Sequence, residues 1–505
     1  MEDLVRSGLL MRYVLALLFG LGLSIIVGFW IGTGALRMIV VLPALLAVTA
    51  VVVGLQRRAW LLIPFAWVLA GKILFIPVTQ FSVRDMAVLL AVVAWVAYYA
   101  FTHIKVTVRW HLLDGLVLAN FLWLGVTYYL HPVGFRSTGS AMIGGRFYWD
   151  AAVALLAYWA LLWIPENSRQ IRRIPLLLAA GAAFPAALGL IAYLRPELTL
   201  LLYNLYSDVE TSFFLAPGEA IYRSSSLAVL GLSIVPYVCA RYAPISLLNP
   251  LRPRFYVLAF ALTCVLLSGF RSGLLWVVPA FLVGSWLRRG WLEGVRVGVL
   301  GGMLLAILIA GQGSLYQLPL SAQRTLSFLP GNWNVTAVED ARGSSDARFQ
   351  WWRDIVQYRL IDNWWLGDGV GFAKRDMDLV FSGSTSIGHL EKGSYHNGPL
   401  TAIRTAGIVG LVLFYSLILT AAWWSVKCAR SCAGSPLFPL AVFIAIPLLW
   451  HPVHYTLIYG QYSMDLVEVI FRIGLLRLAL HARENWVANV TSTEALLPDD
   501  PAVGL

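Results

Sequence analysis

The chain has 505 residues, of which 59% are hydrophobic and only 12% are charged, and its mean hydropathy is +0.75. Soluble domains carry about 25% charged residues, so the composition excludes a soluble globular protein and predicts that most of the chain faces lipid. The net charge is +11. Lys and Arg occur mainly in short connectors between apolar runs, which indicates orientation in a membrane and argues against nucleic-acid binding.

Apolar runs long enough for membrane helices follow one another along the chain, and they predict an all-α polytopic membrane protein with about 12–14 transmembrane helices. The first run, from about Leu9 to Trp30, is too long for the core of a signal peptide and lacks a small-residue cleavage site, so we expect it to remain as a span. The runs lie at about 9–30, 36–55, 59–78, 86–102, 112–130, 150–164, 174–194, 225–240, 255–270, 272–287, 297–311, 398–424, 436–450 and 463–481.

The connectors between these runs predict the orientation. If the N-terminus lies inside, the connectors at 31–35 and 451–462 lie outside, and neither contains Lys or Arg. The inside connectors are all basic: they contain Arg57 and Arg58, Lys105 and Arg109, Arg169, Arg172 and Arg173, Arg241, Arg252 and Arg254, Arg288, Arg289 and Arg296, and Lys427 and Arg430. This alternation is the positive-inside pattern, and it predicts that both termini are cytoplasmic.

We divide the chain into four parts. Residues 1–311 form a helix bundle of about 11 spans, 312–397 a large and mainly helical outer loop, 398–482 the last three helices, and 483–505 a cytoplasmic tail that we expect to be disordered after Trp486. In the outer loop, Ser344, Ser345 and Asp346 are candidate N-caps of a helix whose apolar stripe is Phe349, Trp352, Val356 and Leu360. Residues 366–372 (LGDGVGF) predict a tight glycine loop.

Two arginines on the outer side are candidates for binding an anion. Arg271 lies between two apolar runs with too few residues for a loop, a position that is unfavourable unless the side chain faces a cavity or an anion. Arg348 lies in the outer loop, and its planar guanidinium suits a diphosphate. The alternatives are an Arg271 that reaches the lipid headgroups and an Arg348 that is a solvated surface charge, with Arg353 and Arg359 as competitors.

A histidine and an asparagine stand where the outer loop turns back into an apolar helix. His396 can accept a proton from a hydroxyl near neutral pH, although an interfacial histidine bound to a headgroup has the same appearance. Arg404 follows Asn397 by seven positions, which returns it to the same helix face. A smaller outer loop, at about 195–224, carries Arg223.

Other chemistries find no support in the sequence. The histidines form no H-E-x-x-H set, and there is no G-x-x-x-x-G-K-[ST] loop for nucleotide phosphates. Cys428 and Cys432 have no second pair of ligands nearby. We therefore expect neither a metal nor a cofactor, and because no cysteine lies on the outer side we expect no disulfide framework.

Taken together, residues from about 220 to 480 resemble the O-antigen ligase/polymerase superfamily of bacterial envelope glycan enzymes. Members of that superfamily have about a dozen helices and a large periplasmic loop before the last few. The matching positions are Arg348 and Trp352 of an R-x-x-x-W helix, the glycine turn of Gly367, Gly369 and Gly371, the signature His396, Asn397, Leu400, Gly407, Ile408, Gly410 and Leu411, and, more loosely, Ser268 to Gly273 around Arg271.

The resemblance implies transfer of a glycan from an undecaprenyl-diphosphate carrier to an acceptor hydroxyl, with inversion and without a metal, at the periplasmic side of the bacterial inner membrane. It makes His396, Arg271 and Arg348 the candidate catalytic residues. Asn397, Arg404, Arg223 and Trp352 become candidates for substrate binding. The acceptor is then lipid A–core for a ligase or another lipid-linked glycan for a polymerase, and a non-enzymatic transporter of the same lipids is a third reading.

Overall fold

The computed structural model describes residues 56–74, 81–102, 109–135, 138–163, 168–209, 223–381 and 386–494, together with Ile221 and a few isolated positions before residue 56. These residues are predominantly helical. Within them the sheet is limited to two short antiparallel strands, β1 (Met142–Ile143) and β2 (Phe372–Ala373). The predicted all-α polytopic membrane fold is confirmed. The runs at 9–30 and 36–55 lie outside the described residues.

Six described helices are long and apolar enough to cross a membrane, and two apolar helices are shorter. The six are α4 (Val83–Thr102), α5 (Leu112–Leu130), α8 (Ile174–Leu194), α14 (Trp291–Gly311), α19 (Gly398–Ser431) and α20 (Phe438–Val453), which continues into the π-helix η6 (His454–Ile458). The two shorter apolar helices are α11 (Ser225–Arg241) and α12 (Pro253–Leu267). Predicted runs also coincide with α6 (Arg146–Leu162), α13 (Arg271–Arg289) and α21 (Tyr462–Glu494).

The shorter elements connect these helices. They are η1 (Gln56–Leu61), α3 (Leu62–Ala66), α7 (Ser168–Ile171), η3 (Pro196–Leu198), α9 (Thr199–Leu205), η4 (Pro244–Leu248), α15 (Leu320–Leu326), α16 (Val335–Gln357), η5 (Lys374–Asp376), α17 (Met377–Phe381) and α18 (Ser386–Glu391).

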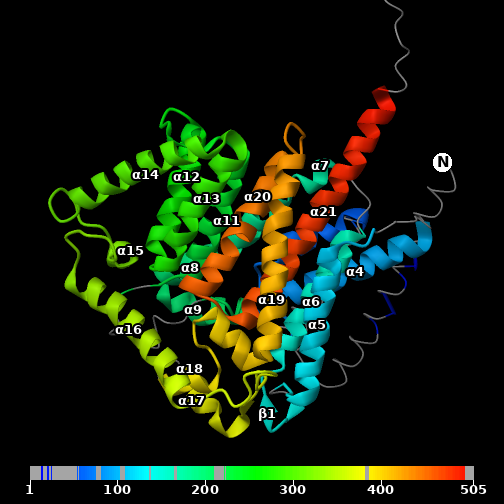
Figure 1. Cartoon of the computed structure of the whole chain (residues 1–505), viewed down its shortest axis with the longest axis horizontal. Helices are drawn as coiled ribbons and strands as arrows, with labels where there is room; N and C mark the ends of the chain where they lie inside the picture. Colours follow the sequence, from blue (N-terminus) through cyan, green and yellow to red (C-terminus); the bar gives the residue numbers. More distant parts are fainter. Residues whose placement is uncertain are drawn as a thin grey trace, which may run out of the picture.

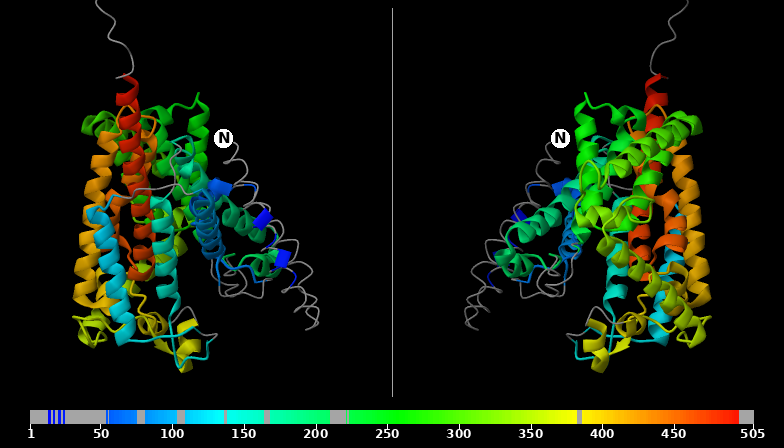
Figure 2. Two further views of the ribbon diagram at one scale, coloured as in Figure 1. Left: turned by 90° about the vertical axis from the view of Figure 1, so that its right-hand side faces the viewer. Right: turned by 90° about the vertical axis from the view of Figure 1, so that its left-hand side faces the viewer.

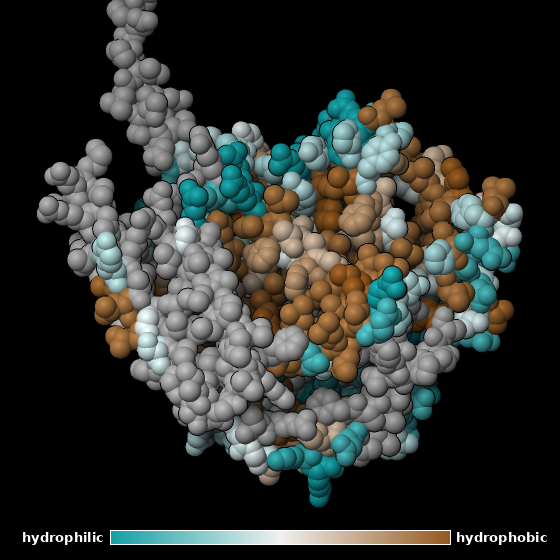
Figure 3. Space-filling view, turned by 180° about the vertical axis from the view of Figure 1, so that it is seen from behind, coloured by the Kyte–Doolittle hydropathy of each residue, from teal (hydrophilic) through white to brown (hydrophobic). Residues whose placement is uncertain are grey.

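The long helices form one bundle with two distinct ends. In Figure 1 the α11–α12 and α19–α20 connectors and the end of α21 lie at the top, whereas α16, α17, α18 and β1 lie at the bottom. The side views in Figure 2 agree with this arrangement. In the view from behind, apolar side chains cover the middle of the face and polar ones gather toward its upper and lower edges, as expected for a surface between two aqueous phases (Figure 3).

Three sequence predictions about helices are wrong. The run at 59–78 is not one helix, because α3 ends at Ala66 and the backbone N–H groups of Gly71 and Lys72 donate to Tyr206 and Ser207 instead of to a helical turn. The outer-loop helix does not begin at Ser344–Asp346: α16 begins at Val335, where the Asn334 side chain caps it. The tail is not disordered directly after Trp486, because α21 continues to Glu494.

Helix α19 is kinked at a glycine. Within α19, Gly407 has φ of 69° and ψ of −178°, which kinks the helix. A Cβ at this position would lie 2.0 Å from the carbonyl oxygen of Trp365, so only glycine fits. The freed N–H of Ile408 donates to the carbonyl of Trp364 at 2.8 Å. At the kink, the turn that contains Trp364 and Trp365 therefore packs directly against α19, and this contact holds the outer loop on the helix.

Candidate active site around α16 and α19

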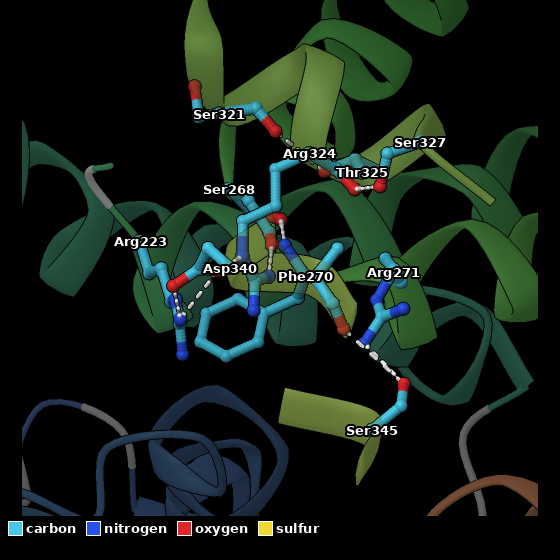
Figure 4. A network of polar contacts seen from close by, with 12 residues as sticks. Arg223, Ser268, Phe270, Arg271, Ser321, Arg324, Thr325, Ser327, Asp340 and Ser345 are labelled. Carbon is cyan, nitrogen blue, oxygen red and sulfur yellow. Dashed lines mark hydrogen bonds and ion pairs between the residues drawn. The ribbon is translucent and has the colours of Figure 1, made fainter. Parts of the chain in front are cut away.

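Arg271 lies at the first position of α13, after a tight turn from α12. The turn depends on Gly269, whose φ is 74°. The Arg271 side chain reaches across to the outer loop, where its Nη2 donates to the hydroxyl of Ser345 on α16 at 3.1 Å (Figure 4). The structure thus directs Arg271 toward α16, as expected for an arginine that faces a site and not the headgroups.

A buried arginine that the sequence did not suggest stabilises this turn. Arg324 of α15 is 3% exposed, and it donates through Nη1 to the carbonyl of Gly269 and through Nε to the carboxylate of Asp340 on α16. Arg223 donates through Nη2 to both oxygens of the same carboxylate, at 2.7 and 2.8 Å (Figure 4). Asp340 on α16 therefore connects Arg223, in the loop before α11, with Arg324 on α15. Arg324 in turn binds the turn before Arg271.

Arg348 completes a cluster of four arginines with one carboxylate. It lies three residues after Ser345 on α16, and its guanidinium stands over the ring of Tyr459 at 5.8 Å. Within the described part of the chain, the ion pairs join Asp340 to Arg223 and Arg324, and none reaches Arg271 or Arg348. The cluster of Arg223, Arg271, Arg324 and Arg348, here called the arginine cluster, keeps an excess of three positive charges.

The charges in this cluster affect one another. Burial, opposed in part by Tyr459 and reinforced by the neighbouring arginines, lowers the pKa of Arg348, which nevertheless stays protonated at neutral pH. Burial alone would raise the pKa of Asp340, but the hydrogen bond and charge of Arg324, together with Arg223, hold that pKa below its usual value. Uncompensated guanidiniums that are partly withdrawn from water favour an anionic ligand.

His396 lies beside this cluster in a strained backbone position. Its φ is 52°, in the left-handed region that non-glycine residues rarely adopt, which makes the site a candidate for function. Two neighbours hold the segment. The indole N–H of Trp352 donates to the carbonyl of Tyr395 at 2.8 Å, and the Asn397 side chain caps α19 by accepting from the N–H of Leu400 at 3.0 Å.

Aromatic rings surround the imidazole of His396. Ring centroids lie 4.9 Å away for Tyr459, 5.4 Å for His389 and 5.9 Å for Trp351. Burial, then the charge of Arg348 and then His389, lower the pKa of His396 to about 4. The imidazole is therefore neutral at pH 7, and its Nδ1 is buried without a hydrogen-bond partner among the described residues. A neutral imidazole with a free acceptor nitrogen can take a proton.

The other predicted site residues have structural contacts of their own. Asn397 is a helix cap, Trp352 supports Tyr395, and Arg223 is bound to Asp340. Arg404 donates to the carbonyl of Gly369 at 3.1 Å and lies 3.5 Å from the carboxylate of Asp368, which in turn accepts from the N–H groups of residues 362 and 363. Arg404 therefore fixes the predicted glycine turn, and a substrate role for these four residues stays a prediction.

Sequence reasoning missed Arg324, Asp340 and Tyr459. Each comes from a stretch without a recognisable pattern, and only the fold brings them to Arg271, Arg348 and His396. Among the described residues, no group of three or more His, Cys, Asp or Glu side chains is placed to hold a metal ion. The prediction that the reaction needs no metal remains untested.

A comparison with known families gives the site its context. Residues 256–415 match the family model described as O-antigen ligase. No curated protein matches the chain. The matched segment runs from α12 through the outer loop into α19, so it contains Arg271, Arg324, Arg348 and His396. This segment is similar to the O-antigen ligase family, and the predicted resemblance to the O-antigen ligase/polymerase superfamily is confirmed.

Proposed function

We propose that this protein is a glycosyltransferase that moves a glycan from an undecaprenyl-diphosphate carrier to a hydroxyl group of an acceptor, at the periplasmic side of the bacterial inner membrane. The observation that carries the proposal is the arginine cluster, with three uncompensated positive charges, beside the neutral and partly buried His396. O-antigen ligase/polymerase-type enzymes act on lipid-linked glycans, and the match over 256–415, which includes Arg271, Arg324, Arg348 and His396, supports the proposal.

The arginine cluster suits the diphosphate of the donor. When the bond between the sugar and the diphosphate breaks, the leaving group gains negative charge, and fixed positive charges nearby lower the energy of that state. Arg271 and Arg348 lack carboxylate partners within the described chain, so their guanidiniums are the ones available for paired hydrogen bonds to phosphate oxygens. Arg223 and Arg324 both bind Asp340, and they add positive charge to the cluster.

His396 suits the role of general base. In the proposed step, the acceptor hydroxyl oxygen bonds to the anomeric carbon, the carbon–oxygen bond to the diphosphate breaks, and the diphosphate leaves with that electron pair. His396 takes the hydroxyl proton, and attack from the face opposite the leaving group inverts the anomeric centre. A base with a pKa near 4 is weak, but the negative charge of a bound diphosphate raises a neighbouring histidine pKa, so the donor itself strengthens the base.

The ligase reading is our first choice, with transfer to lipid A–core, and the polymerase reading is the second, with transfer to another lipid-linked chain. The third, a transporter, requires charged residues lining a path through the bundle. The arginine cluster instead gathers around the loop helices α15 and α16, where Arg271, Arg324 and Arg223 contact Ser345 and Asp340 (Figure 4). The positive-inside pattern supports a periplasmic position for this end of the bundle.

A reconstituted assay tests the proposal. Purified protein in nanodiscs receives carrier-linked glycan together with either lipid A–core or a second carrier-linked chain, and the products are separated by size. We expect wild type to form one product without added metal and His396→Ala to form none, although it folds normally. Lys in place of Arg271 or Arg348 retains the charge but lacks the guanidinium fork, so turnover should fall by about tenfold or more. Normal turnover by His396→Ala would refute the mechanism.

A further inference from the structure

A cavity of about 880 Å³ lies next to the candidate catalytic residues, yet none of His396, Arg271 and Arg348 lines it. Its volume falls within the range of about 300–1,000 Å³ typical of ligand sites. Seven parts of the chain form its walls. They are the turn around Lys72, the residues Gly134 and Phe135, the segment from Ile143 to the start of α6, the glycine turn with β2, the segment Glu391–Gly393, the first turns of α19, and Gln461–Ser463.

The cavity walls carry more positive than negative charge. Lys72 and Arg146 lie on the walls from the 72 turn and α6, and Lys392 and Arg404 on those from the outer loop and α19, whereas Glu391 is the acidic residue in the lining. The carboxylates that pair with these arginines do not line the cavity. Asp85 and Asp150 lie 2.5 and 3.0 Å from Arg146, and Asp368 lies 3.5 Å from Arg404. These aspartates therefore hold the side chains of Arg146 and Arg404 in place from outside the cavity.

The cavity lining also includes aromatic side chains. Phe135 is half-buried, whereas Phe147, Phe372 and Tyr462 are buried. Aromatic faces present the apolar surface on which the C–H groups of sugar rings pack. A lining that combines aromatic rings with cationic side chains fits a sugar that bears negative groups better than it fits a lipid chain or a neutral glycan.

The position of the cavity links it to the candidate base. Gly393 precedes His396 by three residues, Thr401 follows it by five, and Gln461 follows Tyr459 by two. The arginine cluster comes from α13, α15, α16 and the 223 loop, and none of its members lines the cavity. The backbone segment that carries His396 therefore borders two separate sites, a cationic one suited to a diphosphate and this cavity.

We propose that the cavity binds the acceptor, and that the acceptor is an anionic glycan with phosphate or carboxylate groups on its sugars. The inference rests on the proposed transferase function, because it assigns the second substrate of the same reaction. Lys72 and Lys392, from two different segments of the lining, bind the negative groups. Phe135 packs on a sugar ring, and the acceptor hydroxyl approaches His396 from the cavity. The same phosphate chemistry occurs in lipid A–core and in a second carrier-linked chain, so the experiment separates these two sources.

A binding measurement that needs no turnover tests the acceptor site. The protein with His396→Ala is placed in nanodiscs, and its affinity is measured for lipid A–core, for enzymatically dephosphorylated lipid A–core and for carrier-linked glycan. We expect tight binding of one phosphorylated probe and about tenfold weaker binding of it to Lys72→Gln and Lys392→Gln, since each loses one charge-assisted contact. Lys427→Gln, a charge removal at the basic end, is the matched control and should bind as the parent does.

The outcomes separate the two proposals. Preference for phosphorylated over dephosphorylated lipid A–core assigns the cavity to a ligase acceptor. Carrier-linked glycan also binds the donor site, so it assigns the cavity to a polymerase acceptor only if its affinity falls in Lys72→Gln and Lys392→Gln. In wild-type turnover, Lys72→Gln should raise the acceptor KM about tenfold and leave the donor KM unchanged. If transfer occurs but neither lysine variant alters acceptor affinity, or if phosphate removal has no effect, the acceptor site is refuted while the transferase function stands. If the acceptor binds as expected but no transfer occurs, the transferase function fails.

Discussion

The residues around His396 form a small electrostatic unit. The Tyr459 ring lies 4.9 Å from the imidazole of His396 and 5.8 Å from the guanidinium of Arg348, so the histidine and the arginine share one aromatic neighbour. Burial and the Arg348 charge both disfavour the protonated imidazole. The unit therefore keeps the candidate base neutral until an anion arrives, which couples donor binding to base strength.

The first prediction at this scale concerns the pKa of His396. Arg348→Gln removes a positive charge that lowers this pKa, so the pKa should rise above about 4 but stay below the usual 6.5, because burial is the larger cause and persists. The measurement is the pH dependence of the modification of His396 by diethyl pyrocarbonate, which reacts with neutral imidazole, followed by mass spectrometry of the peptide. Arg348→Lys keeps the charge and should leave the profile near that of wild type. An unchanged profile in Arg348→Gln would contradict the coupling.

At the scale of elements, Asp340 connects the parts of the site. Through Arg324 it ties α15 and α16 to the turn that carries Arg271, and through Arg223 it ties them to the loop before α11 (Figure 4). The pKa of Asp340 is lower in the folded protein than in the unfolded chain. Its ion pairs therefore stabilise the fold above the unfolded pKa of about 4, and that stability is lost as the pH falls through the folded pKa.

We expect Asp340→Asn to lower the free energy of unfolding by about 2–3 kcal/mol, because it leaves Arg324 buried without its carboxylate. The value is below the ~3–5 kcal/mol of a fully buried pair, since Asp340 is 33% exposed. Thermal unfolding in detergent at pH 7 measures it. Asp346→Asn, an exposed position on the same helix, should have little effect, and adding Arg324→Met to Asp340→Asn should recover stability. Equal unfolding temperatures for the two Asn variants would show that the link is dispensable.

The sequence predicted the start of α19 but missed the start of α16 and the ion pairs, because only the first of these is marked by neighbouring residues. The register of α19 followed from His396, Asn397 and Gly407, because a helix start and a required glycine leave local marks in sequence. The start of α16 was missed because serines in mid-helix resemble caps, although here the Ser345 hydroxyl bonds to the carbonyl of Ala341. The Arg404–Asp368 and Arg324–Asp340 pairs join positions 36 and 16 residues apart, and no local pattern reports such pairings.

At the scale of the whole molecule, the two ends of the bundle carry different groups of residues. At the basic end, Arg430 of α19 stands over Trp286 of α13, and Arg288 of α13 stands over Phe438 of α20. Lys427 stands over Trp424 of the same helix, α19. The arginine cluster, His396 and the cavity lie at the other end, with α16 and α18 (Figure 1). A donor whose diphosphate is displayed outside the membrane meets the site only if this end faces the periplasm.

The last prediction tests that orientation. The four native cysteines are buried, so the wild-type protein should react little with a membrane-impermeant maleimide, and single introduced cysteines report on their own positions. Arg342→Cys, on the exposed side of α16, should react in intact spheroplasts, whereas Ala433→Cys, exposed in the α19–α20 connector, should react only after the membrane is permeabilised. Both positions are exposed, so accessibility within the fold does not distinguish them and the side of the membrane does. The reverse labelling would place the arginine cluster in the cytoplasm, away from a periplasmic donor, and would contradict the proposed function.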